Sequence, residues 1–94
     1  MKNTTSEVLI TGKLVIVDGE TRSAPIEAEI RVLKNDKLIN MTVANVFGQF
    51  TVRLAKGSGK HILEFAGDDF KSLKTEVIAD EIDQNLGIIE LKRI

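Results

Sequence analysis

Hydrophobic and polar residues alternate along most of the chain with a period of two, which is the spacing of a strand with one buried face. In the segment EAEIRVL, the apolar residues Ala28, Ile30 and Val32 alternate with charged ones, and the segment that begins at Gln49 repeats the pattern. The pattern predicts seven strands, at about residues 8–17, 27–34, 37–44, 49–54, 60–66, 71–78 and 86–92.

Short segments rich in turn-forming residues separate these strands. Asp18-Gly19 is a strong turn dipeptide, and residues 45–48 end on Gly48, which can adopt a positive φ. After that turn Phe50 begins a core-facing alternation, while Phe47 is expected to cover the open end of the core. Seven short strands with frequent turns predict a β-sandwich or a small barrel.

One stretch, residues 71–83, fits two conformations. Leu73, Val77 and Ile82 lie at helical spacings, which would give an amphipathic helix. Thr75 and Val77 favour extended structure instead, because β-branched side chains pack well on a pleated sheet. We therefore predict a strand here and keep the helix as the alternative.

Composition limits the function classes. The chain has 94 residues, so we expect one domain over residues 1–94, without repeat or linker. Its 13 basic and 14 acidic residues nearly cancel and form no basic block, so no nucleic-acid partner is expected. The absence of cysteine excludes disulfides and thiolate zinc sites. No apolar run is long enough for a membrane span, and we do not expect the first residues to act as a signal peptide, because they contain no apolar stretch.

The order of short motifs resembles that of the carboxypeptidase regulatory-like domains, a group within the transthyretin-like (prealbumin-like) sandwiches. The matching residues, spread over about residues 8–92, are Gly12, Pro25-Ile26, Ala28-x-Ile30, Gly48-x-Phe50, Gly59 and Leu63. The chain departs from the pattern at three places: no glycine precedes Ala28, His61 stands where an aromatic residue is usual, and two aspartates separate Gly67 from Phe70.

The resemblance implies an all-β fold, a seven-stranded antiparallel Greek-key β-sandwich. It also implies a non-catalytic accessory module of a larger bacterial protein, at the cell surface or in the periplasm, without cofactor. Its partner would be a protein or a neighbouring domain of a longer chain. The related hydroxyisourate hydrolases use several histidines and a Tyr-Arg-Gly-Ser-type ending, whereas this chain has one histidine and ends in ELKRI. Carbohydrate-binding sandwiches use exposed Trp and Tyr, which are absent here.

Three groups of residues are candidates for chemistry. His61 would need partners from other strands, and otherwise fills a position at the edge of the core. The loop KGSGK (56–60) resembles a phosphate loop, but its spacing is wrong and a strand follows it. Asp80, Glu81 and Asp83 are the best candidates for calcium ligands, and otherwise are solvated turn residues.

Two apolar doublets are the candidates for an interaction surface. Leu38 and Ile39 are adjacent, as are Ile88 and Ile89, so one member of each doublet is expected to face outward from a half-buried strand. They could form a packing surface against a neighbouring domain or a second copy, with weak self-association through an edge strand. Alternatively, each doublet belongs to a strand covered on two sides.

Overall fold

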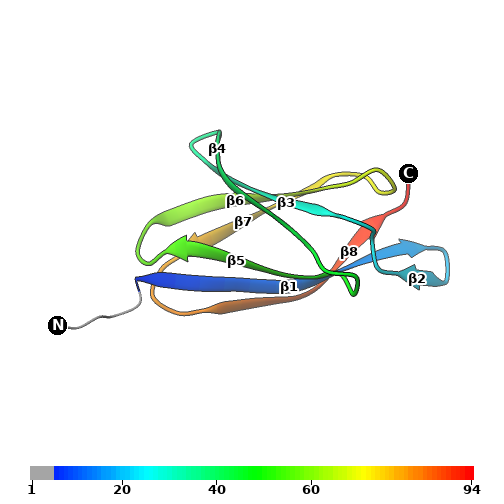
Figure 1. Ribbon diagram of the computed structural model, residues 1–94, viewed down its shortest axis with the longest axis horizontal. Coiled ribbons are helices and arrows are strands. Elements are labelled where there is room, and N and C mark those ends of the chain that lie inside the picture. The colour runs from blue at the N-terminus through cyan, green and yellow to red at the C-terminus, as the bar shows by residue number, and fades with distance from the viewer. Residues whose placement is uncertain (1–5) are drawn as a thin grey trace.

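The computed structural model describes residues 6–94, and every regular element in that range is a β-strand (Figure 1). The eight strands are β1 (Glu7–Asp18), β2 (Thr21–Ser23), β3 (Glu29–Lys34), β4 (Lys37–Val43), β5 (Gln49–Ala55), β6 (Gly59–Ala66), β7 (Leu73–Ala79) and β8 (Gln84–Lys92). The all-β class is confirmed, and so is the strand, rather than a helix, within residues 71–83. No helix within residues 6–94 could cross a membrane.

The strands form two sheets packed as a sandwich. In the first sheet, β1 pairs with β8 along one side and with β5 and β2 along the other. The second sheet has the order β4-β3-β6-β7, and all its pairs are antiparallel. The β3–β4 hairpin turns through Asn35 and Asp36, which both have positive φ, as a tight hairpin turn requires.

Two details of the predicted sandwich are wrong. There are eight strands rather than seven, because β2, three residues long, pairs with the end of β1 inside the expected connection. The sandwich is also not wholly antiparallel, because β8 runs parallel to β1. The chain reaches β8 from β7 of the opposite sheet, so no short hairpin dictates the direction of the last strand.

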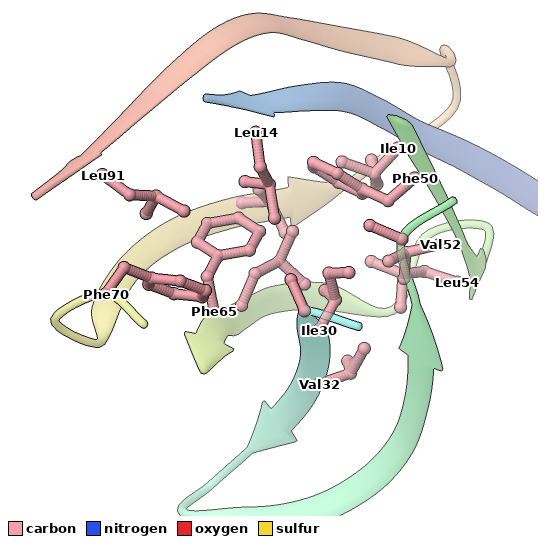
Figure 2. Close-up of a cluster of buried hydrophobic side chains, with 14 of the residues drawn as sticks. Ile10, Leu14, Ile30, Val32, Phe50, Val52, Leu54, Phe65, Phe70 and Leu91 are labelled. Carbon is pink, nitrogen blue, oxygen red and sulfur yellow. The ribbon is translucent and has the colours of Figure 1, made fainter. Parts of the chain in front are cut away.

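The core lies between the sheets and is built from the alternating positions that the sequence pattern selects. Figure 2 shows side chains of the two sheets pointing toward one another, with Phe50 and Phe65 near the middle. Their ring centroids are 5.4 Å apart and the rings are tilted by 54°, an arrangement that aromatic pairs favour. Burial of this apolar surface is the main force that holds the sheets together.

The turn at residues 45–48 is fixed by hydrogen bonds. The side-chain oxygen of Asn45 accepts hydrogen bonds from the backbone N–H groups of Phe47 and Gln49, both at 2.9 Å. The carbonyl of Gly48 in turn accepts a hydrogen bond of 2.8 Å from the N–H of Leu14 in β1. Phe47 is 64% exposed, so the expectation that it covers the core is wrong.

Candidate functional site

Strand β4 is unusual because its apolar side chains lie on the outer face of the second sheet, which points away from the core. Asn40 and Thr42 are opposite the buried residues Val32 and Ile30 of β3, and therefore lie on the face of the sheet that covers the core. Met41 and Val43 lie on the outer face. A half-buried strand normally shows the reverse pattern, so something other than the core must explain the apolar residues of β4.

A bulge adds two further apolar residues to this outer face. The register of β3 and β4 shifts between Val32 and Leu33, which leaves Ile39 without a partner opposite. An extra residue of this kind bends the strand and allows two successive side chains to lie on the same side. Leu38 and Ile39 are both about half exposed, so this doublet does not divide between core and solvent.

We call Leu38, Ile39, Met41 and Val43 the β4 apolar edge. Each of these four side chains is between 49% and 57% exposed. The hairpin that carries them extends away from the body of the sandwich (Figure 1). Sequence reasoning found Leu38 and Ile39 but missed Met41 and Val43. The signal that could have found them is the lack of any charged residue over residues 38–52.

The second predicted doublet divides between the two faces of β8. Ile89 is opposite the buried Leu14 and packs against the core. Ile88 is opposite Lys13 on the outer face of the first sheet and is 62% exposed. The structure therefore separates Ile88 from the β4 apolar edge, which belongs to the other sheet, and does not combine the two doublets into one surface.

The three acidic candidates, Asp80, Glu81 and Asp83, all lie in the β7–β8 connection. Asp83 accepts a hydrogen bond of 2.8 Å from the backbone N–H of Leu9, and thereby ties this connection to β1. Glu81 and Asp83 line a shallow depression together with Arg53 and Lys56, whose positive charges disfavour a cation there. Within residues 6–94 no three His, Cys, Asp or Glu side chains gather in an arrangement that could hold a metal ion.

We expect calcium to leave the unfolding transition unchanged. A ligand present at about one hundred times its Kd adds about 2.7 kcal/mol of stability to the form that binds it. Because the carboxylate of Asp83 is engaged with the chain and two cations lie beside it, no such gain is expected. Thermal unfolding with calcium and with excess chelator tests this. A calcium-dependent rise in Tm that Asp83→Asn abolishes would show a calcium site instead.

His61 lies on the inner face of β6 and is 2% exposed. Its Nδ1 is 2.9 Å from the carbonyl oxygen of Gly59, to which it donates a hydrogen bond. Leu63 and Phe65 follow on the same buried face of the strand. This is the arrangement of a histidine that fills a core position and satisfies its polar atom locally.

The loop at residues 56–60 joins β5 of the first sheet to β6 of the second, so it is not a hairpin loop. Its polar groups already have partners in the chain. The N–H of Gly57 donates to the carbonyl of Asp80 at 2.8 Å, and the Oγ of Ser58 donates to the carbonyl of Ala55 at 2.6 Å. The side chain of Lys34 donates to the carbonyl of Ser58. The loop therefore has no helix N-terminus and no row of free amides for a phosphate.

A second depression lies at the end of the second sheet, where carboxylates and one arginine meet. Glu29 and Glu64 flank Arg31, whose NH2 is 3.0 Å from Glu29 and whose NH1 is 3.7 Å from Glu64. Glu29 and Arg31 line this depression together with seven other residues, which are Ile26, Glu27, Val43, Ala66, Gly67, Asp68 and Asp69. The arginine neutralises part of this acidic group, and all three paired side chains remain in contact with solvent.

These features define a domain with a β-sandwich fold. No family model matches the chain, and a search of curated proteins finds no match. Among solved structures, the chain is similar to GBS52, the minor pilin of the gram-positive pathogen Streptococcus agalactiae, with a TM-score of 0.66 and 15% identity. The similarity covers 95% of this chain and 45% of the pilin chain, so the chain spans less than half of that protein's length. At this identity the similarity shows the fold.

Proposed function

We propose that the chain is a non-catalytic accessory module that acts as a rigid spacer and docking domain within a larger bacterial protein at the cell surface or in the periplasm. The motif resemblance to carboxypeptidase regulatory-like domains supports this, as does the shared fold with a pilin. The non-catalytic character is supported by the dispersal of the candidate groups: His61 lies in the core, whereas Asp83 and Ser58 are engaged with backbone groups.

The observation that carries the spacer role is the parallel pairing of β1 and β8. The two strands lie side by side over seven opposed residue pairs, from Ile10 opposite Gln84 to Val17 opposite Lys92. Because they are parallel, the described chain enters at one end of the body and leaves at the other (Figure 1). The body measures 52 × 25 × 17 Å, so this path follows its long axis.

This geometry determines how a pulling force acts on the domain. A force that separates the two ends along the long axis pulls β1 and β8 past each other, so their interstrand hydrogen bonds share the load. A force applied to both strands at one end would instead break the bonds one after another. The spacer role therefore depends on the resistance of the β1–β8 pair to shear. An ion pair at the C-terminal end of β1 adds to this resistance: the Nε of Arg93 is 3.1 Å from the Oδ2 of Asp18.

We expect the domain to resist force applied through residues 7 and 94 better than force applied through residues 20 and 94. Because the chain has no cysteine, Glu7→Cys/Ile94→Cys and Glu20→Cys/Ile94→Cys provide two defined pairs of attachment points. The first pair loads β1 and β8 in shear, and the second pair peels them apart from one end. Single-molecule force spectroscopy should record a clearly higher unfolding force for the first pair.

Thermal unfolding of both double variants provides the control, since equal Tm values exclude a difference in stability. Equal unfolding forces in the two geometries would contradict the spacer role, because the β1–β8 pair would then not be the element that bears the load.

A further inference from the structure

We propose that two copies of this chain pair through β4, antiparallel and about a two-fold axis at Met41, so that the two second sheets join into one continuous sheet. The occupant of the β4 apolar edge is thus a second copy of the same strand. This inference goes beyond the spacer role and does not depend on it, because a spacer transmits force along β1 and β8 whether or not β4 is paired.

The backbone of β4 has hydrogen-bonding groups that do not pair with β3 and can bond to a second copy. The N–H of Ala44 donates to the carbonyl of Ala28 at 2.9 Å, which marks a hydrogen-bonded pair between the strands. In an antiparallel ladder such pairs alternate with non-bonded ones, so Thr42 also bonds to β3, whereas the backbone groups of Met41 and Val43 point away from it. Among the described residues, β3 is the one strand that pairs with β4.

The sequence of β4 is complementary to itself. Residues 39–43 read apolar, polar, apolar, polar, apolar in both directions. Antiparallel pairing about Met41 therefore places Ile39 opposite Val43 of the second copy, Asn40 opposite Thr42, and Met41 opposite its own equivalent. Apolar side chains face apolar ones on the outer face, where cross-strand pairs of this kind stabilise a sheet.

Charge also favours pairing between copies. Residues 38–52 carry no charged side chain, so a two-fold axis within β4 brings no like charges together. Sheets with an unprotected edge strand associate by edge-to-edge pairing of this strand with another chain. Charged residues on the edge strand usually prevent such pairing. The absence of such residues from the central part of β4 leaves this edge open.

The opposite edge of the same sheet is protected by charged residues, which β4 lacks between Leu38 and Val43, and by a hydrogen bond from another strand. Strand β7 carries Lys74 and Glu76 on its outer face, and Glu76 is 3.6 Å from Lys60. In addition, the side-chain amide of Gln84 donates a hydrogen bond of 2.6 Å to the carbonyl of Ile78, one of the backbone groups on that strand. Lateral pairing through β7 would have to break this bond.

The outer edge of β8, in the other sheet, is also occupied at its end. The N–H of Lys71 donates to the carbonyl of Lys92 at 2.8 Å, and Phe70 forms a bridge with Arg93. Gly87, with φ of 75°, interrupts the regular strand near its start. Of these three edges, β4 offers the longest regular uncharged run.

Asn40 sets the strength of the association. Its side-chain oxygen accepts a hydrogen bond of 2.8 Å from the N–H of Met41, the group at the proposed axis. Pairing must break this bond and replace it with a hydrogen bond to the second copy. Part of the free energy gained by association is therefore lost. A single pair of strands also buries less than the roughly 1,200 Å² of total surface that marks the lower end of stable interfaces. We therefore expect a weak dimer whose population rises with concentration.

Sedimentation equilibrium from micromolar to millimolar concentration tests the proposal. The unaltered chain should show a monomer–dimer equilibrium. Met41→Lys should shift the chain to monomer, because it places two positive charges against each other at the axis. The matched control is Ile78→Lys, at an apolar residue of similar exposure on the opposite edge strand of the same sheet, and it should leave the equilibrium unchanged.

Two further variants separate backbone pairing from side-chain packing. Val43→Pro removes an outward N–H without removing a bond to β3, and should weaken the dimer at least ten-fold. Asn40→Val frees the N–H of Met41 and adds a β-branched residue, and should strengthen the dimer several-fold. Circular dichroism and thermal unfolding identify any variant that fails to fold, and Met41→Lys alone then decides the outcome.

The proposal is overturned if the unaltered chain and Asn40→Val both remain monomeric at millimolar concentration. It is overturned equally if a dimer forms that Ile78→Lys disrupts and Met41→Lys does not, since the dimer then uses the opposite edge. Neither result bears on the response of β1 and β8 to force, so failure of this proposal is distinguishable from failure of the spacer role.

Discussion

Replacement of Gly48 by alanine should destabilise the domain by about 3–5 kcal/mol, one of the largest effects expected for a single methyl group. Two costs add at this position. Its φ of 83° lies in the left-handed region, which costs a residue with a Cβ about 1–2 kcal/mol. The added methyl group would also press against the carbonyl oxygen of Leu14. That contact is with backbone, which cannot move aside as a flexible side chain would.

Gly57→Ala is the matched control for this substitution. Gly57 has a similar φ of 75°, but an added Cβ would meet nothing within 4 Å. This variant therefore carries the cost of the backbone conformation alone, about 1–2 kcal/mol. Urea unfolding of both variants gives the two free energies of unfolding, and their difference isolates the close approach of the turn to β1. Equal losses would mean that the turn moves away from Leu14 at no cost.

The class of fold could be predicted from the sequence because it depends on local information. Alternation in β3 and β5 selects Ile30, Val32 and Phe50 as core residues, and all three are buried. In residues 71–83 the β-branched residues outweigh the helical spacing, because the neighbouring strand β6 pairs with residues 73–79 of this segment. In these places the local pattern and the tertiary structure agree.

The features that could not be predicted depend on which strands become neighbours. The three residues of β2 have too little pattern to be recognised, and they become a strand because the end of β1 is available for pairing. The parallel direction of β8 follows from a connection between sheets, which leaves no trace in the alternation of residues. The second feature is the one on which the proposed spacer role rests, since β8 is the strand that lies parallel to β1.

The candidate site was predicted in part, for a related reason. Leu38 and Ile39 could be predicted as surface candidates because two adjacent apolar residues break the alternation. Met41 and Val43 did not, because they keep the alternation, and an alternating strand is assumed to turn its apolar side inward. That assumption fails for β4, where the register with β3 places Asn40 on the inner face. Only the pairing partner reveals which face of such a strand is covered.

Phe50→Ala should cost about 3–5 kcal/mol of unfolding free energy, the usual range for loss of a buried aromatic ring. Phe50 is 4% exposed, its ring lies against Phe65 across the core, and it also contacts Gly12 of the neighbouring strand β1. Removal of the ring leaves a cavity between two sheets that are already held apart by other side chains, so the site cannot collapse fully. Urea unfolding measures the loss directly.

Phe47→Ala, in the turn that precedes β5, removes an identical ring and should change the free energy of unfolding by no more than about 0.5 kcal/mol. Its side chain is 64% exposed, so little packing is lost. Comparison of Phe50→Ala with Phe47→Ala therefore tests whether the contribution of a ring to the free energy of unfolding depends on its burial in the core or only on its being near the turn. Similar losses for both variants would contradict the structure, because Phe47 would then have to cover the core. A small loss for Phe50→Ala would mean that the two sheets do not meet through its ring.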